Sequence, residues 1–522
     1  MADFDLAIVG GGINGTGIAR DAAGRGLRVL LVEQNDLASG TSSASTKLIH
    51  GGLRYLEHGW VRLVREALSE REVMLRMAPH LTRPLRFVLP QEPGMRPAWM
   101  LRFGLFVYDH LGGRKILPAS RTIDLSRDPL GAPLKDRCRL GFEYYDCQTD
   151  DSRLVVLNAL DAAERGAVIR TRTRCVGAER SEVWQLVLER GGRRDVASAR
   201  VLINAAGPWV GMVAEGVLGQ PPSARLRLDK GSHIVVRRLF EHDCGYVFQT
   251  PDGRVVFALP FEGDFTLVGT TDRSFAGDPS AVTPAPDEVA YLCAVVKDHF
   301  RAAISPPDVV WSFAGVRSLY DDGSRKPQDT PRDYVLALDD KRGQAPLLTV
   351  YGGKITTYRR LAEAALDRLA RVLGARPASG PAWTRHSALP GGDFPFDGVE
   401  RLVAETRRSW PFLSEGHARR LVRAYGTRVT RILGSAKAIE DLGPHLGADL
   451  NGAEVRYLMA HEWAQSEDDV LWRRSKLGLL LTREERERLA KFMATGVGNS
   501  LSPQAGRGEV EQAGRSEASG ER

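Results

Sequence analysis

The sequence predicts an α/β fold in which a lobe built on a parallel sheet carries an inserted antiparallel sheet and is followed by an α-helical C-terminal domain. Three observations predict this arrangement. The first 33 residues have the pattern of a β-α-β unit. Segments between Leu226 and Asp272 alternate in polarity and are separated by turn signals, and apolar residues recur at helical spacing after residue 393.

The β-α-β unit begins with the apolar run Leu6–Val9, which is typical of a strand buried on both faces of a parallel sheet. The helix after it is indicated by apolar residues at helical spacing, Ile18, Ala19, Ala22 and Ala23. Leu27–Val32 reads as a second buried strand, and residues 200–207 form another apolar strand that runs into a glycine. The lobe is therefore expected to be Rossmann-like.

Changes in composition along the 522 residues predict the domain boundaries. Residues 1–373 are expected to form the main lobe, with an interleaved cap whose segments span roughly 81–140 and 218–310. Residues 374–393 are rich in Gly, Pro, Ala and Ser and should form a linker to a helical domain at 394–499. The tail, residues 500–522, lacks aromatic residues and is expected to be disordered.

The composition excludes several classes of protein. With 43% apolar and 26% charged residues the chain is neither fibrous nor wholly disordered. No window has the ~18 consecutive apolar residues of a spanning helix, and no basic stretch marks an export signal, so a cytoplasmic location is expected. The five cysteines contain no C-x-x-C pair, which predicts neither a disulfide framework nor a metal site.

Gly10, Gly12 and Gly15 complete a G-x-G-x-x-G motif between a predicted strand and a predicted helix. These glycines allow a tight turn, a close approach of the backbone to a pyrophosphate, and close packing of helix on strand. Glu33 ends the second strand, where it would accept hydrogen bonds from ribose hydroxyls and repel a 2′-phosphate. A dinucleotide site that disfavours NADP is predicted, but the motif does not separate FAD from NAD.

A segment rich in small hydroxylated residues, residues 40–56, follows this unit and presents His50, Arg54 and Tyr55 within six positions. Such residues let the backbone approach a planar ligand and supply hydrogen-bonding groups at its rim. By composition alone, an ordinary Ser/Thr-rich surface loop explains the segment about equally well.

The order of several longer motifs resembles the FAD-dependent sn-glycerol-3-phosphate dehydrogenases that deliver electrons to quinone. The resemblance covers Asp5 to about Met493, and it rests on residues 8–15, 42–57, 204–210, 230–236, 268–272 and 351–359. It implies a fold similar to D-amino-acid-oxidase-like flavoproteins: an FAD lobe, an antiparallel-sheet substrate lobe above the flavin, and a helical C-terminal domain. It also implies oxidation of glycerol 3-phosphate to dihydroxyacetone phosphate by hydride transfer to FAD N5.

The resemblance assigns the cofactor site to residues in five parts of the chain. The expected FAD-binding residues are Gly10, Gly12, Ile13, Asn14, Gly15, Glu33, Thr41, Ser42, Ser43, Ser45, Thr46, Lys47, Leu48, Ala206, Gly207, Gly353, Lys354, Ile355 and Thr356. Backbone N–H groups near Gly353 are expected to meet flavin oxygens at a helix start.

A substrate phosphate requires fixed donors in place of water, and arginine provides them in a fork. The expected clamp is Arg54, Arg317 and Arg332, with Tyr55 as an added donor; the family motifs add Thr270 and Asp272 as substrate-orienting residues. Removal of the hydroxyl proton requires a base, for which His50 and His233 are both candidates. Lys354 is expected to stabilise developing negative charge.

Residues 59–121 carry eleven Lys/Arg and five Asp/Glu, together with the apolar, aromatic run 99–108. Two arrangements of this run are expected to be possible. It lies in the headgroup region of an anionic membrane, on the inner face of the cell membrane, where a quinone would be the electron acceptor, or it packs as a core helix with a basic rim. The arginines at 419–431 are interspersed with acidic residues, so no nucleic acid is expected as a partner. A homo-oligomer is compatible with the sequence.

Two other functions remain open at this stage. A related flavin oxidase would use oxygen as acceptor, with a glycerol phosphate, amine or amino acid as substrate. A flavin-binding scaffold or sensor would bind the cofactor without turnover. The cationic residues of the expected clamp disfavour an amine substrate, whereas nothing in the sequence decides between oxygen and quinone.

Overall fold

A computed structural model describes residues 2–92, 96–113, 116–321, 333–374 and 382–497. The predicted β-α-β unit is present as β1 (Phe4–Val9), α1 (Ile13–Gly24) and β2 (Val29–Val32). β1 lies in the middle of a sheet, parallel to β2 on one side and to β10 (Arg193–Asn204) on the other. Both faces of β1 are covered as well, because Leu6 and Ile8 belong to one buried cluster and Ala7 to another, which explains why the strand is apolar at consecutive positions.

This first sheet has eight strands, and its main path runs β17-β18-β10-β1-β2-β7. The strands from β18 to β7 are parallel, and β17 is antiparallel to β18. The hairpin β8–β9 continues the sheet by pairing with β10. The strands not yet bounded are β7 (Val168–Arg170), β8 (Arg174–Arg180), β9 (Trp184–Arg190), β17 (Val335–Asp339) and β18 (Leu347–Tyr351).

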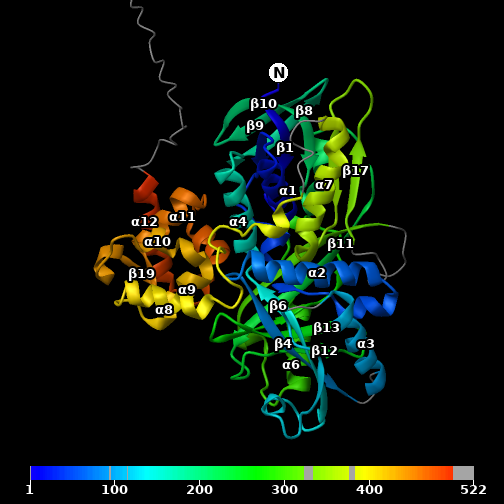
Figure 1. Cartoon of the computed structure of the whole chain (residues 1–522), viewed down its shortest axis with the longest axis vertical. Coiled ribbons are helices and arrows are strands. Elements are labelled where there is room, and N and C mark those ends of the chain that lie inside the picture. The colour runs from blue at the N-terminus through cyan, green and yellow to red at the C-terminus, as the bar shows by residue number, and fades with distance from the viewer. Residues whose placement is uncertain (1, 93–95, 114–115, 322–332, 375–381, 498–522) are drawn as a thin grey trace, which may run out of the picture.

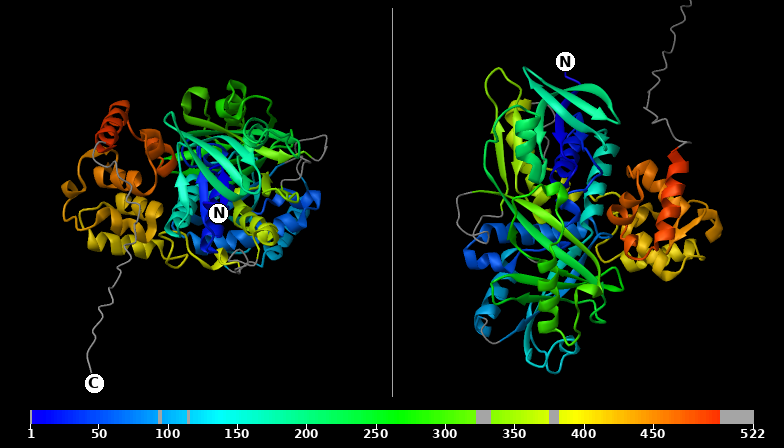
Figure 2. Two further views of the ribbon diagram at one scale, coloured as in Figure 1. Left: turned by 90° about the horizontal axis from the view of Figure 1, so that it is seen from above. Right: turned by 180° about the vertical axis from the view of Figure 1, so that it is seen from behind.

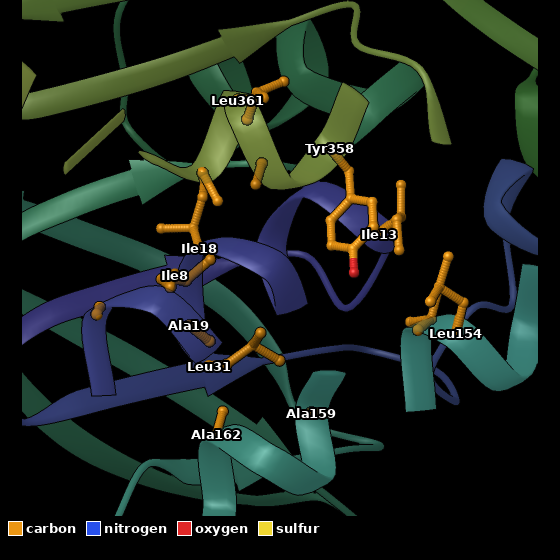
Figure 3. Packing of buried hydrophobic residues seen from close by; sticks show 14 of the residues in the cluster. Ile8, Ile13, Ile18, Ala19, Leu31, Leu154, Ala159, Ala162, Tyr358 and Leu361 are labelled. Atoms are coloured by element: carbon orange, nitrogen blue, oxygen red, sulfur yellow. The ribbon is translucent and has the colours of Figure 1, made fainter. Parts of the chain in front are cut away.

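Three helices cover one part of this sheet. α1 packs between α4 (Asp151–Glu164) and α7 (Tyr358–Leu373), and their facing side chains form one buried cluster with those of β1 and β2 (Figure 3). Ala19 of α1 and Ala159 of α4 are fully buried in it. Such small side chains let the helices approach closely, so the glycine-rich start of α1 is held against the strand before it.

The second sheet has ten strands, with the main path β15-β11-β14-β13-β12-β4-β6-β3 and with β16 and β5 paired to β11 and β6. The predicted hairpin is present, since β12 and β13 pair with Phe248 opposite Val256. The bounds of these strands are β3 (Leu48–Ile49), β4 (Thr82–Gln91), β5 (Arg121–Asp124), β6 (Leu140–Thr149), β11 (Leu226–Arg237), β12 (Gly245–Gln249), β13 (Val255–Phe261), β14 (Phe265–Gly269), β15 (Arg273–Ser274) and β16 (Val309–Tyr320).

The pairing of this sheet differs from the prediction at one place. β4 and β12 are parallel, whereas the other pairs of the sheet are antiparallel. The two strands come from separate stretches of the chain, so no hairpin turn fixes their relative direction. The fold class predicted from the sequence is otherwise confirmed, with a mixed rather than purely antiparallel second sheet.

Four further helices lie around the two sheets. Two run along the lower half of the molecule in Figure 1, α2 (Val61–Met77) and α3 (Ala98–Leu111), and the other two are α5 (Val210–Gly216) and α6 (Pro286–His299). No helix among the described segments is long and apolar enough to span a membrane.

The C-terminal part forms a helical body beside the first sheet, on the side away from α3 (Figures 1 and 2). It contains α8 (Val399–Ser409), α9 (Glu415–Tyr425), α10 (Val429–Leu433), α11 (Gly452–His461) and α12 (Arg483–Val497), with a short pair of strands, β19 (His445–Gly447) and β20 (Leu450–Asn451). It has its own buried apolar cluster, centred on residues such as Leu421 and Leu458. The expected helical domain is therefore present.

Ion pairs join this helical body to the rest of the chain. Arg153 of α4 pairs with Glu462, and both side chains are almost completely buried. Within the expected linker, the Trp383 ring makes cation–π contacts with the guanidinium groups of Arg20 and Arg165. Residues 375–381 and the predicted disordered tail lie outside the described residues, and the exact domain boundaries stay a prediction.

Candidate active site

A single large cavity of about 1720 Å³ connects the two sheets. Three loop segments line much of it: residues 9–14 after β1, residues 39–46 after β2, and residues 352–356 after β18. Strand β16 and the loop after β10 also line it, the latter with Ala206 and Gly207. Because β1, β2, β10 and β18 are parallel, their carboxyl ends meet at one edge, which is where such sheets bind ligands.

The glycine loop places the N-terminus of α1 at this cavity. A Cβ added to Gly15 would lie 2.0 Å from the Gly10 carbonyl oxygen, so only glycine allows the helix to pack this closely. At Gly12, by contrast, the nearest atom to an added Cβ is Ser42 Oγ at 3.1 Å. The first turn of α1 has no acidic residue and no side-chain cap, which leaves the positive end of the helix for an anion.

Glu33 stands at the end of β2 and lines the same cavity. Its carboxylate accepts hydrogen bonds from Gly11 N (2.7 Å) and Asn35 N (2.8 Å). Burial raises the pKa of Glu33, and these two backbone donors oppose the rise. The two bonds hold the carboxylate beside the glycine loop, where a ribose would lie.

The three loop segments are tied to one another by hydrogen bonds. Ser42 Oγ accepts from Ile13 N at 3.0 Å, and Asn14 Nδ2 donates to Gly352 O at 3.0 Å. Thr41 Oγ1 donates to Val316 O in β16 at 2.6 Å. Segments more than 300 residues apart in sequence therefore form one wall, and the predicted residues in them are brought together.

Asp151, the first residue of α4, organises the segment after β2. Its carboxylate accepts hydrogen bonds from Ser45 N (3.1 Å) and Ser45 Oγ (2.7 Å), and it pairs with Lys47 Nζ at 2.8 Å. Both charged side chains are buried. The predicted cofactor residue Lys47 therefore turns away from the cavity, and it does not line it. Burial lowers the pKa of this lysine, with Asp151 opposing the shift.

His233 lies in β11 with its ring in the cavity wall. The ring is stacked on Phe313 with 4.8 Å between centroids, and Nε2 shares a hydrogen bond of 2.9 Å with Thr46 Oγ1. Burial, with Lys47 and Arg317 nearby, lowers the pKa of His233 to about 3. The imidazole is therefore neutral at physiological pH.

His50, Arg54, Tyr55 and Lys354 line the cavity from neighbouring segments. His50 N donates to Thr356 Oγ1 at 3.4 Å, and the His50 ring meets Phe257 edge-on at 6.2 Å. Lys354 Nζ lies 3.9 Å from the centre of the Tyr55 ring, a cation–π contact. The structure thus brings both candidate bases and two predicted cations to one cavity.

Arg317 and Asp272 meet in the same region. Arg317 Nη2 lies 2.9 Å from Asp272 Oδ1, and both residues line the cavity together with Thr270. A Cβ on Gly231 would lie 2.9 Å from Arg317 Nη2 and 2.5 Å from Thr270 Oγ1, so glycine at this position leaves room for both groups. The third predicted arginine of the clamp, Arg332, lies outside the described residues.

Among the predicted site residues that the structure describes, two do not line the cavity, Gly15 and Lys47. The others do: Gly10, Gly12, Ile13, Asn14, Glu33, Thr41, Ser42, Ser43, Ser45, Thr46, Leu48, His50, Arg54, Tyr55, Ala206, Gly207, His233, Thr270, Asp272, Arg317, Gly353, Lys354, Ile355 and Thr356. Gly15 acts as predicted from its motif, by close packing. Which of these residues contact cofactor or substrate stays a prediction.

Sequence reasoning missed several residues of the site. Asp151 begins a helix and has the appearance of an ordinary acidic first turn, so nothing marked it as the partner of Lys47. Trp311 and Phe313 lie at alternate positions of β16 and line the cavity. The signal that could have found them is the alternation of aromatic and small residues just before Gly315. Trp472 and Arg473 of the helical body also line the cavity, although their sequence pattern indicates only a helix.

Comparison with known proteins identifies this arrangement. Residues 5–359 match the family described as FAD dependent oxidoreductase, and residues 382–501 match the C-terminal domain of alpha-glycerophosphate oxidase. The chain is 53% identical to glycerol-3-phosphate dehydrogenase of Pseudomonas aeruginosa, over 94% of this chain and 95% of the relative. It is 49% identical to D-erythritol 1-phosphate dehydrogenase of Brucella abortus, over 92% and 96%.

The fold of a solved structure also agrees. Glycerol-3-phosphate dehydrogenase from Bacillus halodurans, solved in complex with FAD, superposes with a TM-score of 0.76 at 26% identity, covering 96% of this chain and 92% of the other. The site is thus that of an FAD-dependent oxidoreductase. Within that class, the chain belongs to the family that contains the glycerol-3-phosphate dehydrogenases. The resemblance noted in the sequence and the predicted cofactor are confirmed.

The residues present fit FAD. The N-terminus of α1, whose N-cap residue Gly12 has no side chain, faces the cavity where a pyrophosphate would lie, and the Glu33 carboxylate lies beside it. Two buried polar atoms of cavity-lining residues, Asn14 Oδ1 and His233 Nδ1, have no hydrogen-bond partner among the described residues. Buried polar atoms are nearly always satisfied, so these two are suited to a bound ligand.

We expect Gly15→Ala to lower both FAD content and stability, because its Cβ would meet the Gly10 carbonyl oxygen. Overpacking of this kind costs about 1–3 kcal/mol. The control is Gly416→Ala, since Gly416 is also helical and an added Cβ there has no atom within 4 Å among its described neighbours. Flavin absorbance per protein and chemical unfolding measure both effects; equal behaviour of the two variants would contradict the packing argument.

The lowered pKa of His233 predicts a pH dependence of stability. The folded form binds the proton only near pH 3, whereas the unfolded chain binds it near pH 6.5, so stability falls as the pH drops below about 6.5. From pH 6.5 to 5 the loss from this group is about 2 kcal/mol. FAD-free His233→Gln should lose that much less stability than wild type over this range, while exposed His386→Gln should follow wild type.

Proposed function

We propose that this enzyme oxidises sn-glycerol 3-phosphate to dihydroxyacetone phosphate by hydride transfer to FAD N5, and that a membrane quinone receives the electrons. The observation that carries the proposal is the group of cations, Arg54, Arg317 and Lys354, that lines one cavity with two histidines in a flavoprotein fold. Two relatives, 53% and 47% identical to this chain, are named glycerol-3-phosphate dehydrogenase and aerobic glycerol-3-phosphate dehydrogenase, which supports the same substrate.

The phosphate of the substrate carries close to two negative charges at neutral pH. Arg54 and Arg317 would replace its water with charge-assisted hydrogen bonds, while Tyr55 adds a hydroxyl donor. Asp272 holds the Arg317 fork in place, and Thr270 lies beside it as an orienting hydroxyl. Arg332 remains a proposed third member of the clamp.

FAD, when bound, supplies the hydride acceptor. The chain must then take the hydroxyl proton, and the surroundings of the two histidines favour His50 as the base. His233 is neutral and lies near Lys47 and Arg317, which disfavour its protonated form. It is better suited to orient the substrate through a hydrogen bond, and Lys354 to stabilise the negative charge that develops.

A second substrate of the same chemical class is favoured by one observation. The relative with 49% identity is named D-erythritol 1-phosphate dehydrogenase, and it is matched over nearly the whole of both chains. Both compounds are phosphorylated polyols, so the same cationic clamp would serve either. The length of the polyol is the property that an assay must vary.

Helix α3 supports a peripheral association with the anionic inner face of the membrane. Leu101, Leu105 and Tyr108 bury one face of this helix, so it is not packed on all sides. Trp99 is 69% exposed, Phe103 63% and Phe106 51%. An exposed aromatic face with arginine beside it is typical of helices that lie in the headgroup region.

The same helix supports a lipid-soluble acceptor. Met100, Phe103, Gly104 and Val107 of α3 line the large cavity that also contains the histidines. The cavity therefore extends from the flavin region to the proposed membrane surface. A quinone could approach along this apolar wall without crossing water.

Anaerobic addition of glycerol 3-phosphate should bleach the flavin, and a short-chain quinone should restore the colour faster than oxygen does. D-erythritol 1-phosphate and glycerol are compared in the same assay. If only the erythritol phosphate bleaches the flavin, the substrate is D-erythritol 1-phosphate and not glycerol 3-phosphate. If oxygen restores the colour faster than quinone does, the protein is an oxidase. No bleaching by either phosphate would favour the scaffold or sensor function.

Arg317→Gln should lower kcat/KM for glycerol 3-phosphate about 10- to 100-fold, because a hydrogen bond to a charged group contributes about 1.5–3 kcal/mol. The control is Arg273→Gln, whose exposed ion pair with Asp287 lies outside the cavity lining. Steady-state kinetics with the phosphate and with glycerol measure the effect. An equal loss with both substrates would argue against a phosphate contact.

Flotation with anionic liposomes tests whether α3 is the helix that binds the membrane. The triple variant Trp99→Ser, Phe103→Ser, Phe106→Ser should lose most of its binding, because exposed aromatic area provides the apolar part of membrane affinity. The control is Val196→Ser with Ile439→Ser, since both side chains are exposed and lie on other elements. Undiminished binding of the triple variant would exclude α3 as the anchor.

A further inference from the structure

The helical C-terminal domain contributes a wall to the cofactor cavity. Asp468, Trp472 and Arg473 line the cavity that also contains the glycine loop and Glu33. Trp472 and Arg473 belong to a π-helical turn, Asp469–Arg474, and Asp468 immediately precedes it. π-helical turns are rare and are frequent at functional sites.

Charged contacts join this turn to the loop after β2. Arg473 Nε lies 2.6 Å from Asp36 Oδ2, and Arg474 binds the same carboxylate with Nη1 at 2.5 Å and Nη2 at 2.8 Å. Asp36 is 1% exposed and follows Glu33 by three residues. Glu33, whose carboxylate lies beside the predicted ribose site, is therefore in the same loop as Asp36, which binds the helical domain.

A second contact of the turn reaches the other part of the cavity. The Trp472 ring stacks on Trp311 with 4.5 Å between centroids. Trp311 is followed in the same strand by Phe313 at 4.7 Å, and Phe313 stacks on His233 at 4.8 Å. Four rings thus form a continuous row from the helical domain to the imidazole in the cavity wall.

Both contacts require the helical domain to be docked. Asp469, in the same turn, also binds Arg172 Nη2 at 2.7 Å, and the backbone N–H of Arg172 donates to Asn35 O. Loss of docking would remove Trp472 and Arg473 from the cavity and would leave the buried Asp36 carboxylate without its two arginines. The shape of the cavity and the position of the domain are therefore coupled.

We propose that the helical domain forms part of the FAD site, so that cofactor binding and docking of this domain stabilise one another, with Trp472 and Arg473 as positioning residues. Reciprocity follows from linkage: if docking raises the affinity for FAD, FAD stabilises the docked domain by the same factor. The proposal concerns FAD alone, so it holds or fails independently of the substrate and of the acceptor.

Hydrogen exchange of the full-length protein, loaded with FAD and after its removal, tests the coupling. FAD should slow exchange in residues 468–474 at least tenfold, whereas α8 of the same domain, none of whose residues lines the cavity, should change less than twofold. Absence of protection at 468–474 would overturn the proposal. Equal protection of α8 would overturn it as well, because it would indicate a general stabilisation by the cofactor.

Substitutions give the reciprocal measurement. Trp472→Ala and Arg473→Gln should each raise the dissociation constant for FAD at least tenfold, followed by flavin fluorescence, and Trp472→Phe should restore most of the affinity by keeping a ring against Trp311. The control, Arg483→Gln, removes an exposed arginine of the same domain. Wild-type affinity in both cavity variants would overturn the proposal. If Trp472→Ala does not fold, Arg473→Gln and the exchange measurement decide.

Discussion

The buried ion pair between Asp151 and Lys47 is the interaction on which the cavity depends most. Asp151 also accepts two hydrogen bonds from Ser45, so one carboxylate fixes the loop that follows β2. From that loop, hydroxyl groups reach the start of α1, strand β16 and His233. A buried charge without its partner is strongly destabilising, which explains why a lysine in this cavity-lining segment turns toward Asp151 and away from the cavity.

Two cations that line the cavity are held by a neighbour in the chain: Arg317 by Asp272, and Lys354 by the face of the Tyr55 ring. Held in this way, the groups lose little conformational freedom when an anionic ligand arrives. Burial, with Lys47 and Arg317 nearby, lowers the pKa of His233, so the two histidines of the cavity have different surroundings and are suited to different tasks.

The sequence predicted most of the fold because local patterns decide it. The strand, glycine loop and helix at residues 4–24 are specified by neighbouring residues, and so is the hairpin of β12 and β13. The parallel pairing of β4 with β12 was not predictable, since no turn joins the two strands and only tertiary packing sets their direction.

The same distinction explains the outcome at the candidate site. Glu33 and Ser42 line the cavity as expected, because the spacing of their motifs carries the signal, while their contact with FAD stays a prediction. Asp151, Trp311 and Trp472 were missed, because each acts through a partner far away in the sequence. Lys47 was predicted to bind the cofactor, but its ion pair with Asp151 shows that its side chain turns away from the cavity.

The order of strands in the second sheet has a consequence during synthesis. β3, β4 and β6 lie within the first 149 residues, whereas the partner of β4 on its other side, β12, begins at Gly245. Until that stretch has emerged from the ribosome, one edge of β4 presents unpaired backbone groups, which is a template for association with other chains. The nascent polypeptide therefore passes through an interval in which chaperone protection matters most.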